Sequence, residues 1–116
     1  MPLVRMTCSE VIGEEKKAII MKELSKRLSS ITGKPEEYIL IIYQEPCDMM
    51  LGGSDEKSLF LEIKSIGSLD AENTKRIAKN FCRYLSEETG VPSSRINIEF
   101  RDVEKTMWGW NGKTFA

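Results

Sequence analysis

Two stretches of this 116-residue chain repeat each other at an offset of 57 positions. Thr-Gly-Lys-Pro at residues 32–35 leads into the apolar run 38–43, and Thr-Gly-Val-Pro at residues 89–92 leads into the run 95–100. The same offset aligns three apolar pairs upstream of these motifs: Ile20 with Ile77, Leu24 with Phe81, and Leu28 with Leu85. Two units of this period nearly fill the chain, so the sequence predicts one strand–helix–strand unit written twice.

Each unit is predicted to hold one helix between two strands. We expect helices over residues 14–31 and 71–88, and strands over residues 3–7, 38–44, 58–66 and 95–101. Apolar residues at spacings of four, four and three form one face of the first helix: Ile20, Leu24, Leu28 and Ile31. The inner face of the second helix should hold Thr74, Ile77, Ala78, Phe81 and Leu85, after an N-cap at Asp70. Gly33 and Gly90 suit a left-handed cap that ends each helix, and a proline two residues later prevents its continuation.

The strands also bear on the oligomeric state. A helix that connects two strands implies a parallel pair with a right-handed crossover, so two such units in one sheet place both helices on the same face. Residues 38–43 and 59–61 are nevertheless apolar on both sides of their strands. Such strands need both faces covered, and the chain has no third helix for the second face. We therefore expect a homo-oligomer.

The composition excludes several partners and several kinds of chemistry. With 18 acidic and 17 basic residues, the chain has no net field to recruit nucleic acid or an anionic membrane. No stretch approaches the ~20 apolar residues of a membrane span, and no signal peptide is recognisable. Cys8, Cys47 and Cys82 lack a CxxC spacing, which indicates core thiols in a reducing cytoplasm. Without histidine, acid–base chemistry near neutral pH needs a perturbed Lys, carboxylate or Cys, or the α-amino group.

Short motifs in a fixed order along the whole chain add a further indication. They are Met1-Pro2, residues 32–35 with Tyr38-Ile39, Gly52-Gly53-Ser54, Ser65-Ile66-Gly67, residues 95–100, and Gly109-Trp110-Asn111-Gly112 with Thr114-Phe115. With this order and spacing, the chain resembles the macrophage migration inhibitory factor and D-dopachrome tautomerase family of the tautomerase superfamily. The resemblance implies one α+β domain over residues 1–116, a two-layer α/β arrangement with pseudo-repeats at about 1–57 and 58–116.

The family's fold is a tandem βαβ repeat. A four-stranded mixed sheet carries two helices on one face, and a short C-terminal hairpin follows, for which Asn111-Gly112 is a strong signal. Three copies form a homotrimer with their sheets inward, which agrees with the uncovered sheet face.

The family's catalytic base corresponds to Pro2. Removal of the initiator Met1 would expose its secondary amine, and an α-amino group titrates at roughly 7.7–8.0, close to the pH at which a base must work. The resemblance implies that Lys34 binds the substrate carboxylate and that the Ile66 backbone amide meets the substrate, with Ser65 as a weaker neighbour. Four aromatic residues would wall the pocket: Tyr38, Trp108, Trp110 and Phe115. Asn97 and Glu99 would reach the site from a neighbouring subunit.

Each of these positions also has a purely structural interpretation. Pro2 is a permitted second residue, Lys34 suits an exposed position after a helix, and Ile66 is an ordinary strand residue. The aromatic residues, Trp108 above all, suit packing in a core or at a subunit contact. These alternatives stand beside the catalytic interpretation.

The chain departs from the family's mammalian cytokine at three places. Asn97 stands where that protein has a pocket tyrosine, and Glu99 stands where it has an asparagine, so the substrate preference is open. Residues 58–61, Ser-Leu-Phe-Leu, occupy the segment of its CxxC motif. We therefore do not expect a thiol oxidoreductase.

The function predicted in this way is keto–enol tautomerisation of phenylpyruvate-type α-keto acids or dopachrome-like compounds, without a metal or an organic cofactor. The protein would be cytoplasmic, or secreted by a route that needs no signal peptide. The alternative is a cytokine-like ligand that binds a cell-surface receptor and whose tautomerase activity is incidental. A third possibility is a trimeric scaffold with a degenerate pocket.

Overall fold

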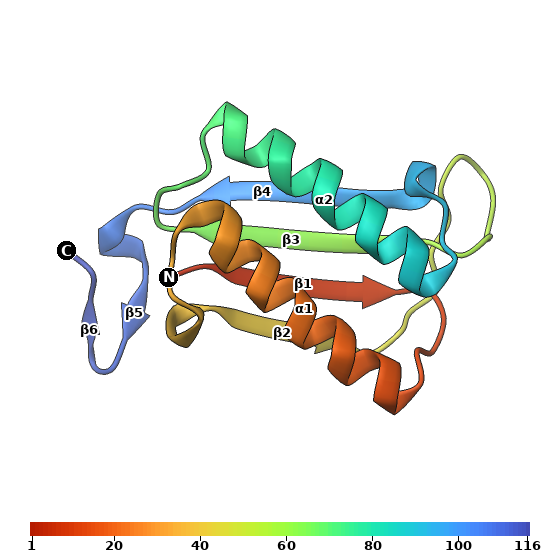
Figure 1. Ribbon diagram of the computed structural model, residues 1–116, viewed down its shortest axis with the longest axis horizontal. Helices are drawn as coiled ribbons and strands as arrows, with labels where there is room; N and C mark the ends of the chain where they lie inside the picture. Colours follow the sequence, from red (N-terminus) through yellow and green to blue (C-terminus); the bar gives the residue numbers. More distant parts are fainter.

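The computed structural model of the protein describes all of residues 1–116. A four-stranded sheet carries two helices, and a small hairpin lies beyond one end of the sheet (Figure 1). The longer elements are β1 (Leu3–Cys8), α1 (Glu14–Thr32), β2 (Leu40–Gln44), β3 (Leu59–Ser65), α2 (Ala71–Thr89) and β4 (Ile96–Asp102). The shorter ones are the 3-10 turns η1 (Glu36–Tyr38), η2 (Ser93–Arg95) and η3 (Lys105–Met107), and the hairpin strands β5 (Gly109–Trp110) and β6 (Lys113–Thr114).

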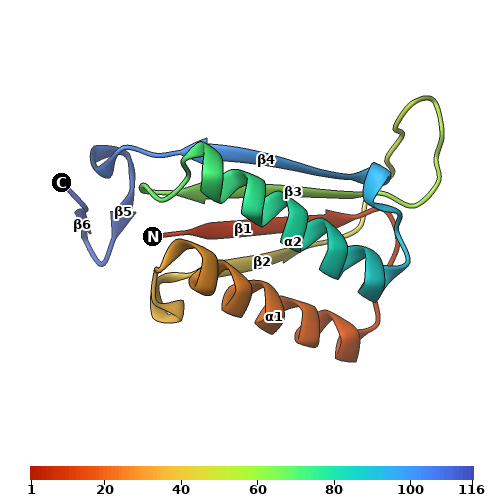
Figure 2. The same ribbon diagram turned by 45° about the horizontal axis from the view of Figure 1, so that its top comes forward.

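The order of the strands shows how the two repeats are joined. In the order β2-β1-β3-β4, the pairs β1–β2 and β3–β4 are parallel, whereas β1 and β3 pair antiparallel at the centre. Each repeat is therefore a parallel βαβ unit, and the two units run in opposite directions within one mixed sheet. Both helices lie side by side on the same face (Figure 2). The predicted α+β class, mixed sheet and shared helix face are confirmed.

The two helix ends are alike at the level of single hydrogen bonds. The N–H groups of Gly33 and Gly90 each donate to the carbonyl four residues earlier, both at 2.9 Å. Both glycines are left-handed, with φ of 75° and 77°. The hydroxyls of Thr32 and Thr89 also donate to the carbonyl four residues earlier, at 2.7 and 2.6 Å. The repeat in the sequence is thus a repeat of local hydrogen bonding.

Two strands begin later than predicted. Pro35 and Pro92 open 3-10 turns in which the N–H groups of Tyr38 and Arg95 donate to the proline carbonyls, at 3.1 and 2.8 Å. Tyr38 and Arg95 therefore lie in η1 and η2 and not in strands. Proline, with φ of −63° at both positions, starts such a turn readily, and sheet pairing begins only after the turn is complete.

We expect Gly90→Ala to lower the free energy of unfolding by about 1 kcal/mol. Alanine is strained at a φ of 77°, although no atom lies within 4 Å of the new methyl group. Urea unfolding followed by circular dichroism measures the change. Gly109→Ala is the matched control, because its φ lies outside the left-handed region and the new methyl group would meet only the Lys113 carbonyl, at an ordinary 3.8 Å. Equal losses in the two variants would contradict the role of the left-handed cap.

The core lies between the helices and one face of the sheet. Helix α1 buries Ile20, Leu24 and Leu28, as its spacing predicts. Helix α2 buries Ile77, Phe81, Tyr84 and Leu85. Thr74 and Ala78, predicted for the inner face, are only half-buried. Tyr84 was not expected in the core; the guanidinium of Arg27 lies 4.2 Å from the centre of its ring and packs the two helices together.

The opposite face of the sheet is open in a single chain. Leu40 and Phe60 on this face are 52% and 37% exposed. Charged side chains share the face, and Arg5 on β1 pairs with Glu62 on β3 at 3.6 Å. The second face is therefore apolar on part of its surface and charged on the rest. The apolar segments 38–43 and 59–61 did not predict the charged part.

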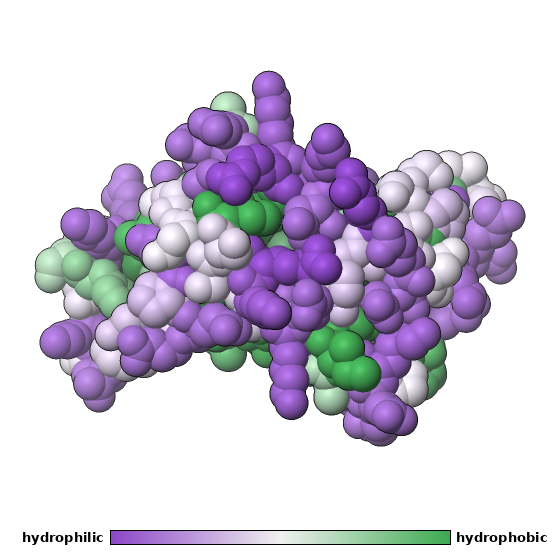
Figure 3. All heavy atoms as spheres, viewed as in Figure 1, coloured by the Kyte–Doolittle hydropathy of each residue, from purple (hydrophilic) through white to green (hydrophobic).

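The outer surface of the helices is mainly polar (Figure 3). An apolar patch lies near the start of α1, where Val11 and Ile19 are 83% and 53% exposed. Neither helix combines the length and the apolar character that crossing a membrane requires.

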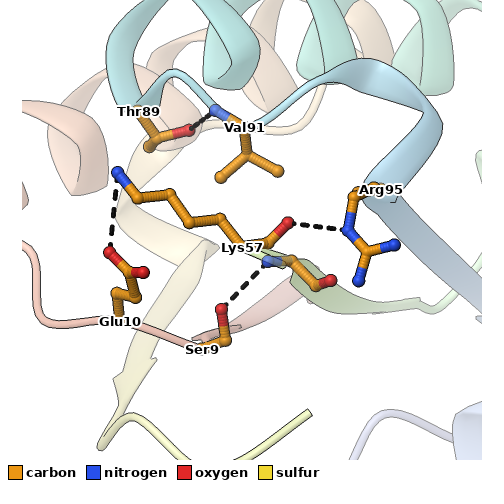
Figure 4. A network of polar contacts seen from close by, with 7 residues as sticks. Ser9, Glu10, Lys57, Thr89, Val91 and Arg95 are labelled. Carbon is orange, nitrogen blue, oxygen red and sulfur yellow. Dashed lines mark hydrogen bonds and ion pairs between the residues drawn. The ribbon is translucent and has the colours of Figure 1, made fainter. Parts of the chain in front are cut away.

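A polar network holds the loop between β2 and β3 at the end of the sheet away from the hairpin (Figure 4). The guanidinium of Arg95 donates to four loop carbonyls at 3.0 to 3.2 Å, those of Leu51, Ser54, Glu56 and Lys57. Gly52 and Gly53, both with positive φ, form the turn that the sequence predicted. Cys47 also lies in this loop and is exposed, so the prediction of three core thiols is wrong at this position.

Candidate functional site

A cavity of about 610 Å³ is lined by residues of the N-terminus, the turn after α1 and the C-terminal hairpin. These segments lie at the same end of the sheet (Figure 1). The walls of the cavity come from four separate segments of the chain. The lining residues are Met1, Lys34, Pro35, Tyr38, Ile66, Lys105, Trp110, Lys113, Thr114, Phe115 and Ala116. Five predicted site residues are brought together here: Lys34, Tyr38, Ile66, Trp110 and Phe115.

The start of the chain supplies an amine to this cavity. Met1 lines the cavity, and Pro2 is buried directly after it. The N–H of Leu40 donates to the Pro2 carbonyl at 3.0 Å, so pairing with the neighbouring strand holds Pro2 in place. Burial first, and then the ammonium of Lys34, lower the pKa of the Met1 amino group from its ordinary value of 8.0. An amine at this position is therefore less protonated near neutral pH than a free one.

Lys34 is positioned by the cap that ends α1. Its N–H donates to the Thr32 hydroxyl at 3.3 Å, and its carbonyl accepts from the Ser29 hydroxyl at 2.6 Å. The side chain is half-buried, and its ammonium takes part in none of the chain's ion pairs. The backbone is fixed while the charge stays free to bind an anion.

Ile66 lines the cavity from the turn that follows β3. The N–H of Gly67 donates to the Asp102 carboxylate at 3.0 Å, which fixes this turn against the neighbouring strand. Ser65 does not line the cavity: its side chain is fully buried, and its hydroxyl has no hydrogen-bond partner. Successive side chains of a strand point to opposite faces, so the neighbour of a pocket residue lies on the core side.

Three aromatic rings form one wall of the cavity. Tyr38 meets Trp110 edge to face, with ring centroids 5.9 Å apart, and Trp110 stacks on Phe115 at 6.1 Å. The hairpin that carries Trp110 turns at Asn111-Gly112, as predicted, and both residues have positive φ. Trp108 precedes the hairpin, is half-buried and does not line the cavity, so the aromatic wall has three members and not four.

Asn97 and Glu99 lie outside the cavity of their own chain. Both are exposed on β4, where Asn97 is opposite Phe60 and Glu99 is opposite Glu62 in the strand register. The Glu99 carboxylate lies 3.8 Å from the Arg101 guanidinium. A contribution from either residue to a site therefore requires a neighbouring subunit.

Sequence reasoning missed two lysines of the cavity, Lys105 and Lys113. The N–H of Phe115 donates to the Lys105 carbonyl at 3.2 Å, and Lys113 is opposite Trp110 in the hairpin. A signal was available, because residues 105–116 contain these two lysines and no acidic residue. From the sequence alone, however, these two lysines could not be distinguished from ordinary charged residues on the surface.

A second cavity, of about 600 Å³, lies at the opposite end of the sheet, near the start of α1. Four glutamates line it together with Lys16 and Lys57. Lys57 pairs with Glu10 at 3.5 Å (Figure 4), and the Lys16 ammonium donates to the Glu88 carbonyl at 2.9 Å. Its glutamates outnumber its lysines, so it is unsuited to a substrate carboxylate, and it has neither a terminal amine nor an aromatic wall. We place the candidate active site in the first cavity.

Comparisons with known proteins agree along the whole chain. A family model described as macrophage migration inhibitory factor (MIF) matches residues 1–116. Over 109 residues the chain is 33% identical to the macrophage migration inhibitory factor of Xenopus tropicalis, covering 94% of this chain and 95% of the relative. The crystal structure of a homologue from Prochlorococcus marinus is 34% identical, with a TM-score of 0.91 over 98% of this chain and 99% of that one. A MIF-like protein from Entamoeba histolytica is 31% identical, with a TM-score of 0.91 over 98% of both chains.

Proposed function

The chain belongs to the macrophage migration inhibitory factor family, within the tautomerase superfamily, and we propose that it is a keto–enol tautomerase. The proposed substrates are small aromatic α-keto acids of the phenylpyruvate type, or dopachrome-like compounds. The proposed base is the amine of Pro2 after removal of Met1. One observation carries the proposal: the terminal amine, which Met1 bears in this chain, has a lowered pKa and shares an aromatic cavity with an unpaired lysine. Pro2 is buried directly after Met1, and removal of Met1 would transfer the terminal amine to it.

In the proposed reaction, the Pro2 amine removes the hydroxyl proton of the enol, and the ammonium group so formed then delivers this proton to the carbon next to the new carbonyl. The electron pair of the carbon–carbon double bond forms the new C–H bond, and the oxygen becomes the ketone. In the reverse direction the amine removes that carbon-bound proton. Lys34 holds the carboxylate, and the Ile66 N–H orients the substrate oxygen. The three rings exclude water from the amine, and the transfer needs no metal or organic cofactor.

The test is the conversion of phenylpyruvate enol to the ketone, which is measured as the loss of the enol's ultraviolet absorbance. The sample must be protein whose mass shows that Met1 has been removed. Absence of turnover in that protein would overturn the proposal.

We expect Lys34→Gln to move the rising limb of the kcat/KM pH profile to higher pH. The unprotonated amine is the active form, so activity rises with pH through the amine pKa. Burial and Lys34 both lower the pKa of the Met1 amine from 8.0, and we expect the same two effects on the Pro2 amine once Met1 is removed. Removal of the Lys34 charge leaves only the effect of burial, so the amine pKa rises and more of the amine is protonated at pH 7. Lys22→Gln, an exposed substitution on α1, should leave the limb in place. An unmoved limb in Lys34→Gln would show that the titrating group is not next to this lysine.

We further propose that three copies assemble with the open sheet faces inward. This assembly would cover Leu40 and Phe60, which a single chain leaves exposed. It would also bring Asn97 and Glu99 of one copy towards the cavity of another. The active site would then be complete only in the trimer.

A second proposed function is that of a ligand for a cell-surface receptor, with incidental tautomerase activity. It is supported by the name of the frog relative, which refers to the migration of macrophages. The protein would act in the cytoplasm in the first case, and outside the cell, without a signal peptide, in the second. Signalling that persists in Pro2→Gly protein would favour the ligand, and signalling that disappears with the activity would favour the enzyme.

A further inference from the structure

We propose that the cavity selects a flat substrate with two acidic groups, one bound by Lys34 and the other by Lys105 and Lys113. This inference rests on the tautomerase function proposed above and narrows its substrate class. The expected substrate is an aromatic α-keto acid that carries a second carboxylate on the side of the ring away from the keto acid.

The charge of the cavity is the first reason. Three lysines and the terminal amine of Met1 line it, and the only lining residue with a carboxylate is Ala116 at the C-terminus, although the whole chain has a net charge of −1. None of the three ammonium groups takes part in the chain's ion pairs, which involve other cations. Uncompensated charge on low-dielectric walls raises the local concentration of anions. The carboxylate of a simple α-keto acid would compensate only one of these lysines.

The positions of the lysines are the second reason. Lys34 lies at the Tyr38 end of the row of rings, four residues before that tyrosine, and its charge acts on the terminal amine. Lys113 is opposite Trp110 in the hairpin, and the Lys105 carbonyl holds the N–H of Phe115. Trp110 is the middle ring of the row and Phe115 is the last, so the two tail lysines belong to the part of the row away from Tyr38. A substrate ring against this wall would place its keto acid at the amine and its other end near the tail lysines.

The test compares two substrates that differ by one charge: phenylpyruvate and 4-carboxyphenylpyruvate. In the unmodified protein, kcat/KM should be about tenfold higher for the dianion, the size expected of two solvent-exposed charge contacts. In Lys105→Gln/Lys113→Gln protein this ratio should fall to near one, mainly through KM for the dianion. The substitutions change side chains only, so the hydrogen bond from the Phe115 N–H to the carbonyl of residue 105 and the pairing of residue 113 with Trp110 should remain. The control Lys22→Gln/Lys75→Gln removes the same charge from exposed helix positions and should keep the ratio.

A binding measurement separates this inference from the proposed reaction. Trp110 lines the cavity, so tryptophan fluorescence can follow the binding of terephthalate and of benzoate, neither of which can tautomerise. Terephthalate should bind about tenfold more tightly, and the double variant of Lys105 and Lys113 should lose this preference. If the protein shows this preference for terephthalate but does not convert the enol, the dianion site is supported and the proposed tautomerase reaction is overturned. Enol turnover with no charge preference in either assay would overturn the dianion site and leave the reaction intact.

Discussion

Protein that begins at Pro2 should convert phenylpyruvate enol at least about 100-fold faster than protein that retains Met1. In the longer form the Pro2 nitrogen belongs to a peptide bond and is not basic. The amine of Met1 is then displaced by one residue, about 3.8 Å along the chain, and a positioned base loses most of its effect at such a distance. Mass spectrometry identifies the N-terminus of each preparation, and stopped-flow absorbance measures the rate.

Two substitutions test whether the rate depends on the N-terminal proline in particular or on the loss of any proline. Pro2→Gly keeps a terminal amine but loses the ring that fixes its direction, so the rate should fall about tenfold or more. Pro46→Gly, in the loop after β2 and outside the cavity, should keep the rate of the parent protein. Equal rates in the two N-terminal forms would rule out Pro2 as the base.

Phe60→Asp should convert the proposed trimer into monomers. Phe60 lies on the open sheet face and is 37% exposed in a single chain, so the substitution should leave the monomer folded. In the trimer, the same carboxylate would be buried without a partner, at a cost of about 3 kcal/mol per subunit, which weakens each association about 100-fold. Sedimentation equilibrium measures the mass, and circular dichroism confirms that the chain remains folded.

Val11→Asp is the matched control for this experiment. It introduces the same charge at an exposed apolar position, 83% exposed, that lies outside the sheet. This variant should remain trimeric and active, whereas Phe60→Asp should lose activity together with assembly. A Phe60→Asp protein that remains trimeric would show that the open face is not the contact between subunits.

The predictions that held depend on interactions within a few residues. Gly33 and Gly90 end their helices as expected, and Asp70 caps α2 by accepting from the N–H of Asn73 at 2.8 Å. The turn at Asn111-Gly112 also follows from the conformations that these two residues tolerate. Such features are set by local chemistry, so they can be recognised one segment at a time.

The placements that the sequence did not foresee depend on how separate segments pack. Trp108 and Trp110 look equivalent in the tail, yet only Trp110 faces the cavity. Ser65 and Ile66 are neighbours, yet one is buried in the core and the other lines the site. Tyr84 is buried, and the guanidinium of Arg27 lies over its ring, a contact between two helices that neither helix predicts alone.

By itself, the sequence determined the two βαβ units and the ends of their helices, because caps, turns and helix faces arise from bonds and spacings within each segment. Only the tertiary structure decided that the cavity holds three lysines and three rings from distant segments. Parallel pairing of β1 with β2 and antiparallel pairing of β1 with β3 bring the N-terminus, Lys34, Ile66 and the tail to one end of the sheet. The parallel pairing of β4 with β3 places Asn97 and Glu99 on the open face, because long-range backbone hydrogen bonds decide which side chains share a surface.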